Sequence, residues 1–402
     1  MQSEKTLLAA AIAILVTAMP ALAAGVAIPA ADAPPINAQI GVTYNSNVAG
    51  SSAAFAAARG LSQSDEIFSP ALAVNYSKQL GIESFYLQGT GGYDFYASNT
   101  ILNRERIGVQ GGAVTLLSPC QFTVRGSYMR RQSDLQDLNI IFTKNTAEDV
   151  VAGLDVVCSG FGRLVPSASV QQTWSNNSAP ILFASDYQSL SAQGSLAYGA
   201  GNWGNISLIG AYVDTQFQNR FIPLPSGFQK DGYKVYSGGV HYDKDLDAAL
   251  HIALSLSQTS LSYDGLGLNF SGLTYDAALA YHPDSRFQVQ VSYARRTSPS
   301  NYFNAAYSVD QILQGDVSYR LTSRLKAGLG VSNRRQNFVG SDLNLATDLT
   351  KQSITSFNAS LGLNITERMN LALFARHDQR HADLAAYGYA ATQVGLTLSQ
   401  AF

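Results

Sequence analysis

Apolar and polar residues alternate along many short segments of this chain. The segment 287–294 (FQVQVSYA) carries its large apolar residues at odd positions, and the segments 250–257 (LHIALSLS) and 120–128 (CQFTVRGSY) carry them at even positions. A period of two is typical of a β-strand with one apolar and one polar face. The pattern alone does not separate a soluble β-sandwich, whose apolar faces form a core, from a membrane barrel, whose apolar face meets lipid.

Short turn sequences rich in Gly, Pro, Asp and Ser recur at roughly 40-residue intervals. Each interval has room for two tilted strands of about 9–11 residues and one longer polar loop. Eight such turns predict nine hairpins, and therefore an all-β transmembrane antiparallel barrel of about 18 strands, with 16 as the alternative. Short turns would lie on the periplasmic side and longer loops on the extracellular side. The predicted turns are 80–82, 118–119, 160–162, 201–204, 244–246, 283–285, 322–324 and 366–368.

The N-terminal residues have the form of a secretory signal peptide. Lys5 precedes an apolar stretch at 7–19, Pro20 ends that stretch, and the small residues 21–23 precede Ala24. The apolar stretch is shorter than the roughly 20 residues that a spanning helix needs, so we predict cleavage rather than anchoring. The expected organisation is a signal peptide at 1–23, an Ala/Pro-rich periplasmic lead-in at 24–35 and a barrel at 36–402.

Composition and the C-terminal strand favour the membrane barrel over a soluble sandwich or β-helix. Only 13% of residues are charged, whereas soluble domains carry about 25%. Aromatic residues of apolar parity lie near segment ends, where aromatic girdles occur in barrels; they are Tyr128, Trp174, Tyr281, Tyr293 and Tyr319. The last strand places residues 394, 396, 398, 400 and Phe402 on one face. A sheet in lipid must close, because open edges would leave backbone groups unpaired.

Two stretches resemble known outer-membrane proteins. The final strand, ending in Phe402, resembles the signal by which the barrel-assembly machinery recognises its substrates. The segments 120–128, 132–138 and 150–158 are similar to β-barrel porins of alphaproteobacteria, some of which accompany exopolysaccharide gene clusters. The resemblance implies an outer-membrane barrel, and it implies a saccharide or exopolysaccharide solute that leaves with separate periplasmic export components.

The two cysteines are placed symmetrically about a loop. Positions 120 and 158 centre on Asn139, and both cysteines share the apolar parity of their strands. Residues opposite each other in a hairpin come close enough for a disulfide, and the periplasm is oxidising. We therefore predict a Cys120–Cys158 disulfide, with two free thiols as the alternative. Neither a CxxC motif nor a neighbouring histidine favours redox or metal chemistry.

Charged residues of polar parity are the candidate lumen-lining residues. Their signs are mixed, which predicts a hydrophilic channel without strong ion selectivity; the alternative is that they pair and brace the wall. Tyr86 and Tyr96, of the same parity, are candidates for stacking on sugar rings. The candidate lumen-lining residues are Asp94, Arg125, Asp155, Asp276, Asp316, Arg320, Lys326, Arg334 and Arg376.

Two polar segments are candidates for loops that narrow the lumen, the alternative being mobile extracellular loops. Residues 49–65 include an Ala-rich stretch at 53–59 that predicts one or two helical turns. Residues 219–230 contain Pro223 and Pro225, which favour a loop.

Catalysis has little support in the sequence. Nucleophile-elbow, phosphate-loop and zinc signatures are absent. His377 and His381 have i,i+4 spacing, but we do not expect them to converge on a strand as they would on a helix. We therefore predict no enzyme, cofactor or metal, keeping a barrel-borne phospholipase as a remote alternative class. The net charge of −2 gives no footprint for nucleic acid.

These patterns favour a porin-like channel for passive passage of hydrophilic solutes. The alternative is a non-conducting surface barrel that acts as an adhesin or a structural protein. Expected partners are outer-membrane lipid and lipopolysaccharide, the barrel-assembly machinery, saccharide solutes and periplasmic export components. The sequence does not set the oligomeric state.

Overall fold

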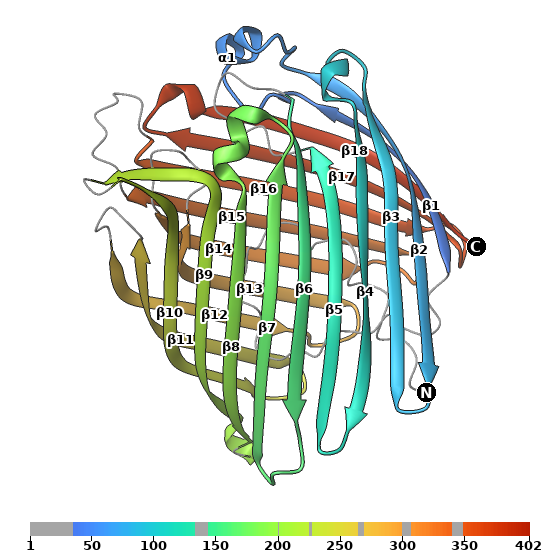
Figure 1. Cartoon of the computed structure of the whole chain (residues 1–402). Coiled ribbons are helices and arrows are strands. Elements are labelled where there is room, and N and C mark those ends of the chain that lie inside the picture. Colours follow the sequence, from blue (N-terminus) through green and yellow to red (C-terminus); the bar gives the residue numbers. More distant parts are fainter. Residues whose placement is uncertain are drawn as a thin grey trace.

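The computed structural model describes residues 35–132, 144–199, 201–224, 227–263, 269–299, 307–339 and 349–402. In this part of the chain, 18 strands form one antiparallel sheet. β1 pairs with both β2 and β18, so the sheet closes into a barrel (Figure 1). The predicted fold class is confirmed. The strands are β1 (Ile36–Asn45), β2 (Asp65–Leu80), β3 (Glu83–Tyr96), β4 (Arg104–Leu117), β5 (Cys120–Gln132), β6 (Thr146–Cys158), β7 (Leu164–Asn177), β8 (Tyr187–Gly199), β9 (Asn205–Leu224), β10 (Gly227–Asp245), β11 (Leu250–Tyr263), β12 (Phe270–Tyr281), β13 (Phe287–Pro299), β14 (Tyr307–Arg320), β15 (Leu325–Val339), β16 (Lys351–Asn364), β17 (Met369–Ala382) and β18 (Tyr389–Ala401).

The two ends of the barrel differ in the length of their connections. All eight predicted short turns lie between consecutive strands, from β2–β3 to β16–β17. We call this end the turn end. Both chain ends of the barrel meet there, because the Phe402 backbone N–H donates to the Ile36 carbonyl at 2.9 Å. The opposite end, the loop end, carries longer connections with the helices α1 (Ala53–Ala58), η1 (Thr100–Leu102), η2 (Pro180–Ser185) and η4 (Ala385–Tyr387).

Several predicted segments lie wholly or partly outside the described residues. These are the signal peptide at 1–23, the lead-in up to residue 34 and the loop centre at 133–143. The helical turn predicted at 53–59 is confirmed by α1.

The loop predicted at 219–230 is wrong for the residues that the structure describes. Strands β9 and β10 continue through most of it as a hairpin, in which Phe221 pairs with Lys230 and Pro223 with Phe228. A bulge between Lys230 and Gly232 interrupts the register, and the tip of the hairpin turns sideways in Figure 1. Pro223 is tolerated because each strand of a two-stranded extension has one free edge.

The register assigns every strand residue to the inner or the outer face. Large apolar side chains occupy the outer face and remain exposed, with Leu208 59% and Leu329 65% accessible. The inner face instead contains buried polar groups, such as Thr259 and Asp310. A soluble sandwich would bury its apolar face, so this distribution is that of a barrel surrounded by lipid.

One seam in the barrel wall is short. β12 and β13 pair only from Tyr275–Arg295 to Tyr281–Val289, so the part of β12 nearer the loop end pairs with β11 alone. At the point where the ladder ends, the Arg295 side chain donates to the Leu273 carbonyl at 3.0 Å. The Arg295 side chain thereby replaces a backbone partner that the seam lacks.

Candidate functional site: the inner face of the barrel

The nine candidate lumen-lining residues all occupy inner-face positions of the register. Six of them form ion pairs: Arg125 with Asp155 (2.7 Å), Asp94 with Arg106 (2.8 Å), Arg334 with Asp310 (2.6 Å), Arg376 with Asp378 (2.8 Å) and Asp276 with Arg296. Arg125 and Asp155 are the only two candidates that pair with each other among these described ion pairs. The partners of the other paired candidates, Arg106, Arg296, Asp310 and Asp378, are not among the residues predicted from the sequence.

The remaining three candidates lie nearer the turn end. Asp316 accepts a hydrogen bond from the Gln314 amide at 2.8 Å. Arg320 and Lys326 are directly opposite each other on β14 and β15. Neither has a carboxylate within ion-pair distance among the described residues, so two adjacent cations mark the turn end of the inner face.

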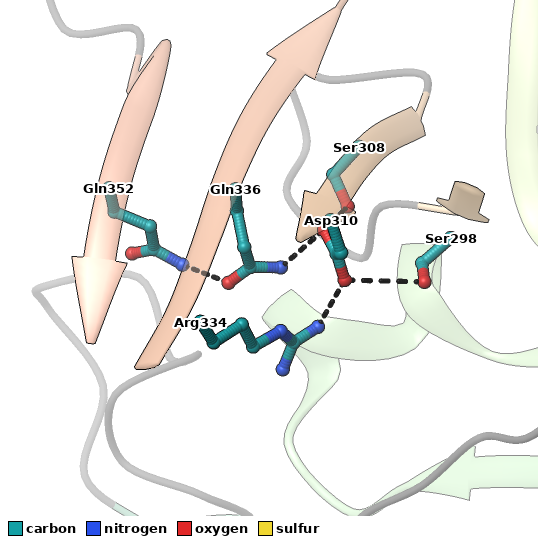
Figure 2. A network of polar contacts seen from close by, with 6 residues as sticks. All are labelled: Ser298, Ser308, Asp310, Arg334, Gln336 and Gln352. Atoms are coloured by element: carbon teal, nitrogen blue, oxygen red, sulfur yellow. Dashed lines mark hydrogen bonds and ion pairs between the residues drawn. The ribbon is translucent and has the colours of Figure 1, made fainter. Parts of the chain in front are cut away.

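A network of polar side chains centred on Asp310 crosses the wall from β13 to β16 (Figure 2). Asp310 is 1% exposed. Its carboxylate accepts from Ser308 Oγ (2.7 Å), Arg334 (2.6 Å), Gln336 (3.1 Å) and Ser298 Oγ (3.4 Å). Gln352 donates to Gln336. Four donors around one buried carboxylate satisfy its lone pairs.

The Asp310 network extends to β17 through a second arginine. Arg380 Nε donates to the Gln352 side-chain oxygen at 2.7 Å, and its guanidinium lies 5.3 Å from the centre of the Tyr387 ring. On the same two strands, Asp378 accepts from Ser356 and from Arg376. The inner wall of β13–β17 therefore consists of linked polar groups. Asp310 is six residues from Asp316 on β14, so the alternation in the sequence already predicts that both lie on the inner face.

An aromatic cluster occupies the inner face of β8–β11 near the loop end. Its buried residues are Phe217, Tyr233, Leu261 and Tyr263, together with Tyr307 at the start of β14, and Tyr187 packs against them. Phe217 is 2% exposed. The ring centres of Phe217 and Tyr233 are 6.2 Å apart, and those of Tyr233 and Tyr263 are 6.4 Å apart. Rings at these distances pack against each other, so the cluster fills this part of the inner face with side chains.

A charged pair lies beside this cluster at the interruption of the β9–β10 register. The Arg220 guanidinium lies 3.4 Å from the centre of the Phe217 ring and pairs with Asp231. The Tyr263 hydroxyl donates to Asp231 at 2.9 Å. Because residues 219–230 were predicted to be a loop, neither Arg220 nor the adjoining Asp231 was predicted to lie on the inner face.

Three connections at the loop end pack into one unit, which we call the lid cluster. Its buried residues come from the β1–β2, β3–β4 and β7–β8 connections and are Val48, Ala49, Ala56, Leu61, Leu102, Ala179 and Leu182. The Arg59 guanidinium donates to the Ala49 carbonyl (2.7 Å) and to Ser51 Oγ (2.6 Å). Directly after η2, burial raises the pKa of Asp186 although hydrogen bonds from Asn177 oppose that shift. The segment 49–65 is thus a packed part of the loop end.

The two tyrosines suggested for sugar stacking are occupied by the protein. Tyr86 is 7% exposed and lies against Gly112, where a Cβ atom would come within 2.9 Å of the ring. Tyr96 packs against the lid cluster. Tyr86 and Tyr96 do lie on the inner face, but these contacts with the protein leave little ring surface for stacking on a sugar.

Cys120 and Cys158 lie opposite each other at the turn end, on the outer face of β5 and β6. They form a disulfide with an S–S distance of 1.97 Å. This bond closes the hairpin at the end opposite its long loop.

The described residues contain no group of three or more potential metal ligands. No helix among them is long and apolar enough to cross a membrane. His377 and His381 share the outer face of β17, contrary to the expectation that they do not share a face. Four residues of strand nevertheless separate them by about 13 Å, which is too far for one metal ion.

One inner-face histidine contacts a serine, since His241 Nδ1 lies 2.7 Å from Ser255 Oγ. In the part of the chain that the structure describes, no carboxylate bonds to the other ring nitrogen of His241. The pair therefore lacks the third member of a catalytic triad.

No protein-family model matches this chain, and no curated protein is similar to it. Solved structures are similar in fold. OccK2 (OpdF) of Pseudomonas aeruginosa, in complex with glucuronate, aligns with a TM-score of 0.49 at 10% identity, over 90% of this chain and 96% of that one. OccAB3 of Acinetobacter baumannii aligns with a TM-score of 0.48 at 10% identity, over 91% and 98%. The siderophore receptor PirA of Pseudomonas aeruginosa aligns with a TM-score of 0.43 at 10% identity, over 91% and 80%. At these values the likeness concerns the fold alone.

Proposed function

We propose that this protein is an outer-membrane channel for the passive passage of hydrophilic solutes. One observation carries the proposal: a closed barrel of 18 strands has exposed apolar side chains on its outer face and polar side chains on its inner face. Barrels of about 16–18 strands enclose an aqueous channel. The turn end would then face the periplasm and the loop end the exterior.

The inner face favours uncharged or weakly charged solutes, and we propose saccharides as the class. Most inner-face charges are neutralised by a partner in the wall, as in Arg125–Asp155 and Arg334–Asp310. Hydroxyl and amide groups lie between them, such as Gln171, Ser191 and Gln193 on β7 and β8. These groups donate and accept hydrogen bonds, as the hydroxyl groups of a sugar do.

Conductance of the purified barrel in a planar lipid bilayer tests the channel. We expect stepwise openings in salt solution, and a smaller step when oligosaccharides are added to either side. The inner-face variants Arg125→Glu and Asp316→Lys should change the ratio of cation to anion permeability, whereas the outer-face variant Lys234→Gln should not. A folded wild-type barrel that shows no steps would overturn the proposal.

One observation favours the non-conducting surface barrel. The lid cluster packs three connections together at the loop end, which suits a closed external surface. If the wild type shows no steps but a variant lacking residues 50–62 does, the lid closes the barrel and the surface function gains support.

Export and assembly form part of the proposal. Cleavage after Ala23 predicts a mature chain that begins at Ala24, which mass measurement of the protein from outer membranes can test. Phe402 ends next to Ile36 at the closure of the barrel. Deletion of Phe402 should slow assembly in cells, and unchanged amounts of folded barrel would contradict the role of Phe402 as the assembly signal.

A further inference from the structure

The outer face of the barrel has an uneven distribution of charge. On strands β11–β18, the described outer positions carry Arg295, Arg335, Lys351, His377 and His381. Every Asp or Glu of these strands lies on the inner face. On strands β1–β10, the half nearer the loop end carries outer carboxylates at Glu66, Glu105, Glu148 and Asp214.

The outer-face arginines of β1–β10 and of β11–β18 differ in their partners. Arg130 on β5 is neutralised by Glu105 at 2.8 Å and Glu148 at 3.0 Å. Arg295 and Arg335 have no carboxylate partner among the described residues. One N–H of Arg295 donates to the Leu273 carbonyl, and the side chain of Arg335 is exposed.

Arg295 and Arg335 lie in one row across the wall. Arg295 is directly opposite Gln311 on β14, and Gln311 is directly opposite Arg335 on β15. Neighbouring strands are about 4.8 Å apart, so the two arginine backbones are about 10 Å apart with an amide between them. We call Arg295, Gln311 and Arg335 the arginine row.

The arginine row lies at the edge of the apolar band. Tyr275 and Tyr293 lie next to it on β12 and β13, with ring centres 5.7 Å apart. Val291 and Val289 follow toward the turn end. Tyrosines at the edge of an apolar band are typical of a membrane–water interface, and arginine above them reaches the layer of lipid headgroups.

We infer that the arginine row binds the phosphorylated glycolipid headgroup of the outer leaflet. The inference rests on the proposed outer-membrane location. A guanidinium binds phosphate with two parallel N–H···O bonds, and the apolar band beneath the row accommodates the acyl chains of the same molecule. A soluble anion would match the arginines but not the apolar surface below them.

The test measures binding of purified lipopolysaccharide to the folded barrel in detergent at physiological ionic strength. We expect the double variant Arg295→Gln/Arg335→Gln to bind at least about tenfold more weakly than the wild type, which corresponds to about 1.4 kcal/mol. The matched control Arg130→Gln, whose arginine is already neutralised, should bind like the wild type. Arg335→Gln alone, which breaks no bond within the described chain, should give an intermediate loss.

Two further ligands separate a lipid site from a phosphate site. Dephosphorylated glycolipid should bind the wild type and the double variant equally weakly, and inorganic phosphate should not compete at millimolar concentration. Equal binding of lipopolysaccharide by the wild type and the double variant would overturn the inference, as would full competition by inorganic phosphate. The double variant should retain wild-type conductance steps, so failure of the lipid site and failure of the channel are separate outcomes.

Discussion

The inner face is stabilised in two different ways on two neighbouring parts of its wall, β8–β11 and β13–β17. On β13–β17, Asp310 and its donors form a polar network in which each group satisfies another. On β8–β11, the aromatic cluster fills the inner face by packing. Both groups are buried, with Asp310 1% and Phe217 2% exposed, but hydrogen bonds and an ion pair hold the network, whereas apolar contact between rings holds the cluster.

The comparison also shows where each wall is sensitive to mutation. Packing tolerates the loss of a hydroxyl but not of a ring, because its stabilisation comes from buried area. A buried network tolerates little, because removal of one member leaves its partners without hydrogen bonds. The following variants test this difference, from the largest expected effect to the smallest.

Phe217→Ala should be the most damaging change. Removing a ring that is 2% exposed leaves a cavity and should lower the free energy of unfolding by about 3–5 kcal/mol. Urea unfolding of the barrel in lipid measures it. The control Phe228→Ala, at a ring that is 81% exposed on the same hairpin, should change stability by less than about 0.5 kcal/mol. Equal effects of the two variants would contradict the packing role of the cluster.

Asp310→Asn should lower the free energy of unfolding by about 2–3 kcal/mol. The reason is that a buried carboxylate, which accepts all its hydrogen bonds, is replaced by an amide whose NH₂ group faces other donors. The substitution should also leave Arg334 unneutralised and shift the bilayer current toward anions. Asp316→Asn is the matched control, since Gln314 is the hydrogen-bond partner of Asp316 among the described residues. The free energy of unfolding of this variant should change by less than about 1 kcal/mol. If Asp310→Asn left the free energy of unfolding unchanged, the network would not stabilise the wall.

Tyr233→Phe should lower the free energy of unfolding by about 0.5–1.5 kcal/mol, because the Tyr233 hydroxyl loses its hydrogen bond with Thr215. The ring keeps its contacts with Phe217 and Tyr263, and Thr215 retains its hydrogen bond with Ser189 at 2.8 Å. Urea unfolding again measures the difference. A loss as large as that of Phe217→Ala would mean that hydrogen bonds, rather than packing, hold the aromatic wall.

Arg125→Gln should have the smallest effect on stability, below about 1 kcal/mol, because solvent screens the partly exposed pair with Asp155. Its effect on permeability should be larger, since Asp155 is then unpaired on the inner face. Reversal potentials in a salt gradient should move toward cation preference, and Arg125→Lys should restore them. An unchanged potential would place this pair outside the conducting path.

The strand pattern and the turns were predictable because they are local in the sequence. A period of two predicts which face of a strand each residue occupies, and each short turn is predicted by the types of its own residues. Symmetry about Asn139 was enough to place position 120 opposite position 158. Pro223 favoured a loop at 219–230, but it lies in β9, because a proline that breaks a central strand is harmless on a free edge.

The amino-acid sequence by itself determined the class of the barrel, its short turns and the face of most strand residues, but not the strands that run through 219–230. Only the tertiary structure decided which charges meet. Arg334 binds Asp310 although Gln336 is the residue directly opposite, and Arg296 binds Asp276 from a strand whose direct partner there is Ala294. Long side chains reach diagonal neighbours, and the stagger between strands sets which neighbours are in reach. The same stagger brought Arg295, Gln311 and Arg335 into one row.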